Sequence, residues 1–108
     1  MAEIDWAKPV AEVYNLIRAA NPAPGAWGTI KGQKVDIFDS AKASGSGKPG
    51  EVLSINDQGM TVAAGGGTIL AKRVRGADRK KIAAAEWAKA AGVKANDAFD
   101  KPAPKSQA

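Results

Sequence analysis

The sequence predicts a small, mostly β domain, a partly open barrel of about five short strands with an amphipathic helix before it and a short helix after it. Three observations predict this fold class. Apolar residues near the amino end have helical spacing, and the middle of the chain is a series of short apolar segments separated by turns that contain glycine. The total length of 108 residues corresponds to one domain, and one helix followed by about five short strands is too little for a β-sandwich.

The first element is a helix over residues 9–20. Pro9 suits the first helical position, because its missing N–H needs no partner there and its fixed φ is already helical. The apolar side chains follow the i, i+3, i+4, i+7 rule: Val10, Val13, Tyr14 and Ile17. Asn21-Pro22 ends the helix, since proline cannot continue it.

Five short segments with strand character follow. Their expected ranges are 26–31, 33–41, 51–56, 60–64 and 68–75. Residues 57–59 form a short hairpin connection, and the glycine- and serine-rich residues 42–50 form a flexible loop. We expect an alanine-rich helix over residues 82–91, which ends at Gly92. Residues 93–108 are predicted to form a flexible tail.

The expected core consists of apolar residues from the first helix and all five strands. These residues are Val13, Leu16, Ile17, Trp27, Val35, Ile37, Val52, Leu53, Ile55, Val62, Ile69 and Val74. Trp27 begins an apolar strand and Trp87 lies in the alanine-rich helix, so core positions suit both better than stacking on nucleobases. Trp6 fits either role.

The composition excludes several classes of chemistry. The chain has no His and no Cys, which excludes Ser-His-Asp and Cys-His nucleophiles, a Cys/His zinc site and disulfides. Strand alternation places Asp36 and Asp39 on opposite faces, and Asp97 and Asp100 fall in the expected tail, so no rigid carboxylate pair is expected. We therefore expect neither catalytic residues nor a metal site. The sequence also has no apolar run long enough for a membrane span or a secretory signal, so the expected location is cytoplasmic.

One short segment accounts for the net charge of +5. Residues 72–81 contain a single acid and six bases: Lys72, Arg73, Arg75, Arg79, Lys80 and Lys81. If Val74 points into the core, strand alternation places Arg73 and Arg75 on the outer face, with the other bases close by after a turn at Gly76. Such a cluster attracts a polyanion such as RNA, although a solvated strand end and turn would have the same composition.

Motifs along most of the chain resemble the carboxy-terminal domain of methionyl-tRNA formyltransferase and related formyltransferases. The matching residues are Ile4-Asp5-Trp6, Pro9, Asn15 to Ala19, Asn21-Pro22, Pro24 to Trp27, Gly32, Pro49 to Val52, Gly59, Gly65 and Lys80-Lys81. The resemblance implies a domain over residues 1–92 with an OB-like barrel, attached to a catalytic domain of Rossmann type. It also implies that 10-formyltetrahydrofolate and a catalytic Asn, His and Asp belong to that separate domain, so this chain alone is expected to have no activity and to bind no cofactor.

The resemblance leaves two functions open. In the first, this accessory domain binds the formyl acceptor, initiator methionyl-tRNA, through the six bases named above. In the second, it is a docking or oligomerisation domain of a formyltetrahydrofolate-dependent enzyme whose acceptor is not tRNA. The segment from Val74 to Arg79 keeps the second alternative open, because it differs from the Leu-Gln pair that the tRNA enzymes usually have before the glycine.

Overall fold

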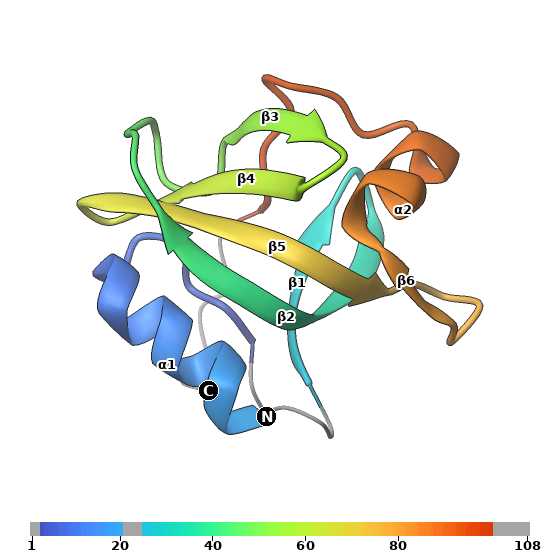
Figure 1. Cartoon of the computed structure of the whole chain (residues 1–108), viewed down its shortest axis with the longest axis horizontal. Coiled ribbons are helices and arrows are strands. Elements are labelled where there is room, and N and C mark those ends of the chain that lie inside the picture. Colours follow the sequence, from blue (N-terminus) through green and yellow to red (C-terminus); the bar gives the residue numbers. More distant parts are fainter. Residues whose placement is uncertain (1–2, 21–24, 101–108) are drawn as a thin grey trace, which may run out of the picture.

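The computed structural model describes residues 3–20 and 25–100, and within them the fold has six strands and two helices (Figure 1). The elements are α1 (Val10–Ala20), β1 (Ala26–Ile30), β2 (Gln33–Ala43), β3 (Val52–Asn56), β4 (Gly59–Ala64), β5 (Gly67–Arg75), β6 (Lys81–Ala83) and α2 (Ala84–Ala91). The predicted fold class is confirmed, with one additional strand. Residues 81–83 pair with β5 as β6, so the second helix begins at residue 84. The predicted helix end at residues 21–22 lies outside the described residues.

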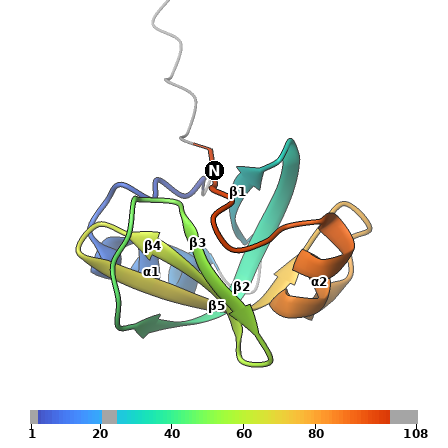
Figure 2. The same ribbon diagram turned by 90° about the horizontal axis from the view of Figure 1, so that it is seen from above.

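All strand pairs are antiparallel and form one curved, open sheet. The strand order is β1-β2-β5-β4-β3, and β6 pairs with the end of β5. The long strands β2 and β5 lie at the centre, while β1 and β3 are the two edges (Figure 2). An open sheet of this kind leaves the backbone groups of its edge strands in need of partners.

Residues 96–100 supply those partners and close the barrel between β1 and β3 (Figure 2). On the β3 side, the Asn96 N–H donates to Val52 O at 2.8 Å and the Phe99 N–H donates to Gly50 O at 2.7 Å. On the β1 side, the Asp100 N–H donates to Thr29 O at 2.8 Å. The prediction of a flexible tail was therefore wrong for residues 93–100, and residues 101–108 lie outside the described part of the chain.

The two helices cover different parts of the sheet. α1 lies against β2 and β5 and buries Val13, Ile17 and Ala20, which are successive positions on one helical face (Figure 1). α2 lies against β4 and β5 and buries Ala84, Trp87 and Ala88. No helix within residues 3–20 and 25–100 has the length and apolar character needed to cross a membrane.

Most of the expected core is buried as predicted. The confirmed residues are Val13, Ile17, Val35, Ile37, Val52, Val62, Ile69 and Val74. Leu16, Trp27, Leu53 and Ile55 are only partly buried. Trp27 faces outward because alternation along β1 turns Ala26 and Ile30 into the core.

Aromatic residues outside the predicted set complete the core. Trp6 is 2% exposed, and its ring centroid lies 5.0 Å from that of Phe99. Trp6 is thus a core residue and not a nucleobase platform, and Trp87 is buried as expected. The segment of residues 3–9 brings Trp6 into place, because the Ile4 N–H donates to Trp27 O at the edge of β1.

Candidate nucleic-acid interface

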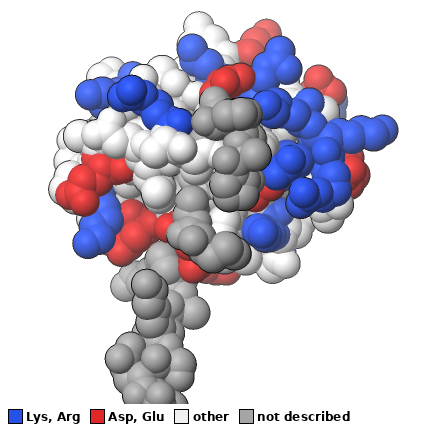
Figure 3. Space-filling model, turned by 90° about the horizontal axis from the view of Figure 1, so that it is seen from below, with Lys and Arg blue, Asp and Glu red and all other residues white. Residues whose placement is uncertain are grey.

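The structure brings the six predicted bases together on one end of the molecule. Lys72 and Arg73 lie in β5, Arg75 ends this strand, Arg79 and Lys80 lie in the turn, and Lys81 begins β6. All except Arg75 are exposed. Figure 3 shows this group as a dense cluster of Lys and Arg side chains on the side where β6 and its turn lie in Figure 1. We call the five exposed residues Lys72, Arg73, Arg79, Lys80 and Lys81 the hairpin patch.

Arg75 has a different environment from its neighbours. Its Nη2 lies 2.9 Å from Asp36 Oδ2, and its Nε donates to the same oxygen at 3.0 Å. The two side chains are 20% and 8% exposed. Arg75 therefore joins β5 to β2 through a largely buried ion pair and is less exposed to a phosphate than the other five bases.

The pairing of β2 with β5 is irregular at the base of the patch. Ile37 faces Val74 and Asp39 faces Arg73, so Phe38 is an extra residue on β2. This bulge corrects the prediction about the two carboxylates: Asp36 and Asp39 pair with Arg75 and Arg73, which flank the inward-facing Val74, and therefore share the outer face. The sequence shows no sign of the bulge apart from two consecutive apolar residues in an alternating strand.

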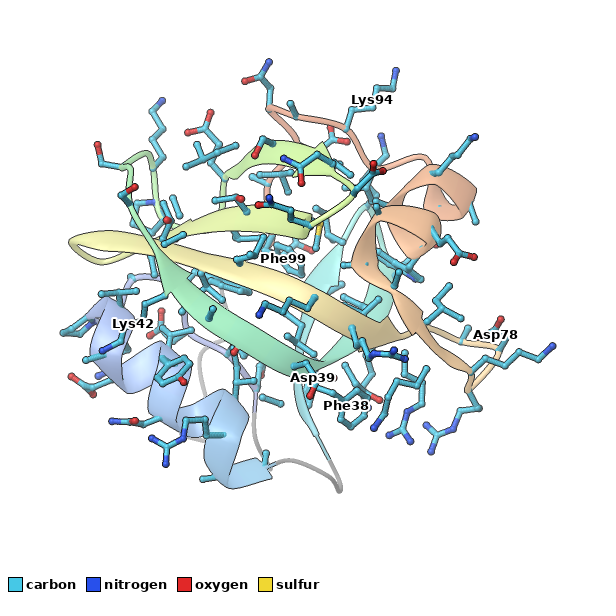
Figure 4. All side chains as sticks on the ribbon, in the orientation of Figure 1. Phe38, Asp39, Lys42, Asp78, Lys94 and Phe99 are labelled. Atoms are coloured by element: carbon cyan, nitrogen blue, oxygen red, sulfur yellow. The ribbon has the colours of Figure 1, made fainter. Side chains whose placement is uncertain are left out.

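Phe38 lies beneath the basic side chains and supports them. It is 1% exposed yet lies on the outer side of the sheet, away from the central core. Lys81 Nζ lies 4.4 Å from its ring centroid, and the Arg75 guanidinium carbon lies 4.9 Å from it. Both distances fall within the range of cation–π attraction, so the ring holds the start of β6 and the end of β5 together. Figure 4 shows Phe38 and Asp39 beside each other on this side of the sheet.

The turn between β5 and β6 is fixed by local contacts. Asp78, the only acid of residues 72–81, accepts a hydrogen bond from the Lys80 N–H at 3.0 Å. The Arg79 N–H donates to Gly76 O at 3.0 Å, and Arg79 has φ of 67°. Gly76 packs against Trp87, since a Cβ at this glycine would lie 2.6 Å from the indole Nε1. α2 thereby anchors the base of the turn that presents Arg79 and Lys80.

A hollow of about 390 Å³ lies beside the patch, between this turn and the β1–β2 turn. Lys34 lines it together with Arg75 and Arg79. Lys34 was missed by the sequence analysis, because nothing in the local pattern relates it to residues 72–81. Its Nζ lies 4.8 Å from the ring centroid of Trp27, so this half-buried ring holds a seventh base close to the predicted six.

Within residues 3–20 and 25–100 there is no group of three carboxylates that could hold a metal ion. The acids near the patch are engaged with bases or with the turn. The geometry therefore provides a fixed cationic surface.

Comparison with protein families identifies the domain. The model described as "Formyl transferase, C-terminal domain" matches residues 1–92. The chain belongs to this family. Two curated relatives are methionyl-tRNA formyltransferases: that of Dinoroseobacter shibae is 44% identical over 85 residues, and that of Magnetococcus marinus is 31% identical over 91 residues. These matches cover 79% and 84% of this chain but only 27% and 29% of the two relatives.

Solved structures share the fold of this formyltransferase C-terminal domain. A multiply substituted variant of HypX from Aquifex aeolicus is 26% identical, with a TM-score of 0.76, over 99% of this chain and 20% of that protein. HypX from the same organism in complex with tetrahydrofolic acid is 24% identical, with a TM-score of 0.75, over 99% of this chain and 19% of that protein. The domain thus corresponds to a small part of each larger enzyme, and the predicted family is confirmed.

Proposed function

We propose that this formyltransferase C-terminal domain helps to hold the formyl acceptor, initiator methionyl-tRNA, through the hairpin patch. The observation that carries the proposal is the exposure of five bases on a rigid hairpin whose only acid is used within the turn. Bases arranged in this way bind phosphates by ion pairing and by releasing counterions. The relatives named as methionyl-tRNA formyltransferases favour tRNA as the source of those phosphates.

The chemistry of transfer belongs, on this proposal, to another part of the enzyme. The chain spans less than a third of the curated relatives it matches. We place 10-formyltetrahydrofolate and the catalytic residues in a separate catalytic domain, and we expect this chain alone not to transfer formyl groups. A role in preparing initiator tRNA would place the enzyme in the cytoplasm.

A second candidate function is docking onto a catalytic domain or another copy of the chain. An apolar hollow of about 450 Å³ favours it, lined by Trp6, Pro49 and Phe99 at the closure between the edge strands. Docking through such a surface would depend mainly on apolar contact, so it would respond only weakly to salt. RNA binding and docking can therefore be separated by their salt dependence.

The test is a salt titration of initiator-tRNA binding, followed by fluorescence anisotropy. With four or five phosphate contacts, we expect the logarithm of the association constant to fall with the logarithm of salt concentration with a slope of roughly −3 to −4.5. Arg73→Gln/Lys80→Gln should flatten the slope by about 1.5, because each lost phosphate contact removes about 0.7 to 0.9. It should weaken binding to unrelated RNA similarly, since phosphate contacts do not read bases.

Lys89→Gln/Lys94→Gln is the matched control. It removes the same charge from exposed positions in and after α2, and Figure 4 shows Lys94 at the opposite end of the molecule from Phe38 and Asp39. The control should keep the wild-type slope to within about 0.5. Absence of wild-type binding near 50 mM salt, or equal slopes for the two double variants, would contradict the RNA proposal and leave the docking role.

A further inference from the structure

A second cationic surface lies next to the hairpin patch, in a groove between α1 and the sheet. The groove has a volume of about 490 Å³ and runs between α1 and the outer face of β2 and β5. Its charged and aromatic lining includes Tyr14, Arg18, Asp39, Lys72 and Arg73. Two of these residues, Lys72 and Arg73, also belong to the hairpin patch, so the groove and the patch form one continuous surface.

Tyr14 gathers two bases that are distant in the sequence. The Arg18 guanidinium carbon lies 5.6 Å from the ring centroid of Tyr14, and Lys42 Nζ lies 5.4 Å from it. Arg18 is oriented further by Asn15, whose Oδ1 accepts a hydrogen bond from Nη1 at 3.3 Å. Both charged groups are within cation–π distance of one half-buried ring, which fixes their positions beside the groove.

The charge in the groove is mostly uncompensated. Asp39 lies 3.6 Å from Arg73, and both side chains are more than half exposed, so this ion pair is weak. Among the residues that the structure describes, Arg18, Lys42 and Lys72 form no salt bridge. Arg18 and Lys72 line the groove, and Lys42 lies at its border on the Tyr14 ring. Bases without acidic partners in such an arrangement suit the phosphodiester backbone of RNA.

The distribution of basic side chains over the groove and the hairpin patch suits an extended ligand. Figure 3 shows basic side chains on the α1 side as well as on the hairpin side, with both basic and acidic side chains along the upper edge between them. An acidic protein surface would find the same charges, but bases that continue from an exposed hairpin along an open groove to α1 match a chain of phosphates better than a compact acidic face. We propose that this groove, together with Lys42 at its border beside Tyr14, is a second phosphodiester subsite, in which Arg18 and Lys42 contact the RNA backbone and Tyr14 positions them. The inference rests on the proposed function and extends the contact from the hairpin to α1.

The charge test compares Arg18→Gln/Lys42→Gln with Lys89→Gln/Lys94→Gln in the same anisotropy titrations of initiator tRNA. Loss of two phosphate contacts should flatten the slope by about 1.5 and weaken binding about tenfold at low salt. The control removes equal charge and should leave the slope within about 0.5 of wild type. Unchanged RNA binding by the groove variant would overturn the subsite.

The ring test keeps every charge in place. Tyr14→Phe retains the ring and should bind RNA like the wild type, whereas Tyr14→Leu frees both bases and should weaken binding about threefold or more. The melting temperatures of the two variants, compared with the wild type, show whether the leucine variant is folded. If it is not, Tyr14→Met provides a second variant without the ring.

The outcomes separate this inference from the proposed function. Flattening by Arg73→Gln/Lys80→Gln, without flattening by Arg18→Gln/Lys42→Gln, would overturn the groove and leave the hairpin patch. Flattening by both double variants, with equal affinity of the phenylalanine and leucine variants, would overturn the positioning role of Tyr14. Absence of binding by the wild type would overturn both proposals.

Discussion

Replacing Phe99 with alanine is expected to destabilise the domain by about 3 to 5 kcal/mol, the usual cost of removing a buried phenylalanine ring. Phe99 is 5% exposed, and its ring fills the space between Trp6 and Gly28. A Cβ at Gly28 would lie 2.9 Å from this ring, so the two residues pack closely. The ring also anchors the segment that hydrogen-bonds both edge strands. Urea unfolding followed by tryptophan fluorescence measures the change in free energy.

Two controls show whether the effect comes from the ring itself. Phe99→Leu retains most of the volume and should cost less than about 1.5 kcal/mol, provided that the site can repack. Lys94→Gln changes an exposed residue just before this segment and should stay within about 0.5 kcal/mol of the wild type. If Phe99→Ala also stays within that range, residues 96–100 do not close the barrel in solution.

Replacing Arg75 with glutamine is expected to cost about 3 kcal/mol of stability, near the lower limit for breaking a buried ion pair. The variant leaves the Asp36 carboxylate, whose side chain is 8% exposed, without its charged partner. The expected loss of stability lies near the lower limit for buried ion pairs because the Arg75 side chain is still 20% exposed, so water reaches part of the site. Urea unfolding provides the measurement.

Arg73→Gln is the matched control, because it changes the same residue type two positions earlier on the same face of β5. Arg73 lies 3.6 Å from Asp39 in an exposed pair, so the expected cost is below about 0.5 kcal/mol. Asp36→Asn/Arg75→Gln should recover part of the stability lost in Arg75→Gln, because no buried charge is left unpaired. Equal effects of Arg73→Gln and Arg75→Gln would contradict the structural role of Arg75. The two arginines should also differ in RNA binding, where Arg73→Gln changes the slope without unfolding the domain.

Much of the fold could be predicted from the sequence, because its signals are local. The spacing from Val10 to Ile17 defines the buried face of α1, and Gly92 ends α2 with φ of 76°. The glycine turns separate strands whose ranges agree with the prediction to within a few residues. The hairpin patch could also be predicted from the sequence, because its residues are near neighbours in the chain.

The tertiary structure alone decided the features that join distant residues. The bulge at Phe38 depends on how β2 aligns with β5, and it reverses the face on which Asp39 lies. The ion pair of Asp36 with Arg75 spans 39 positions of sequence. The groove likewise needs α1 to lie against β2, so that the Tyr14 ring, which contacts Arg18, also reaches Lys42.

Residues 96–100 show most clearly why the tertiary structure contains information that the sequence alone does not reveal. Small polar residues between Gly92 and Pro102 are typical of a frayed end, and nothing near them in the sequence offers a partner. The partners are the free edges of β1 and β3, which exist only after the sheet has curved. Periodicity and turn residues determined the elements because they act between neighbours in the chain. Packing decided the register of the strands, the closure of the barrel and the gathering of the basic side chains. Unpaired backbone groups at a sheet edge and exposed apolar surfaces are covered by the segment that the fold brings to them, however distant it is in the sequence.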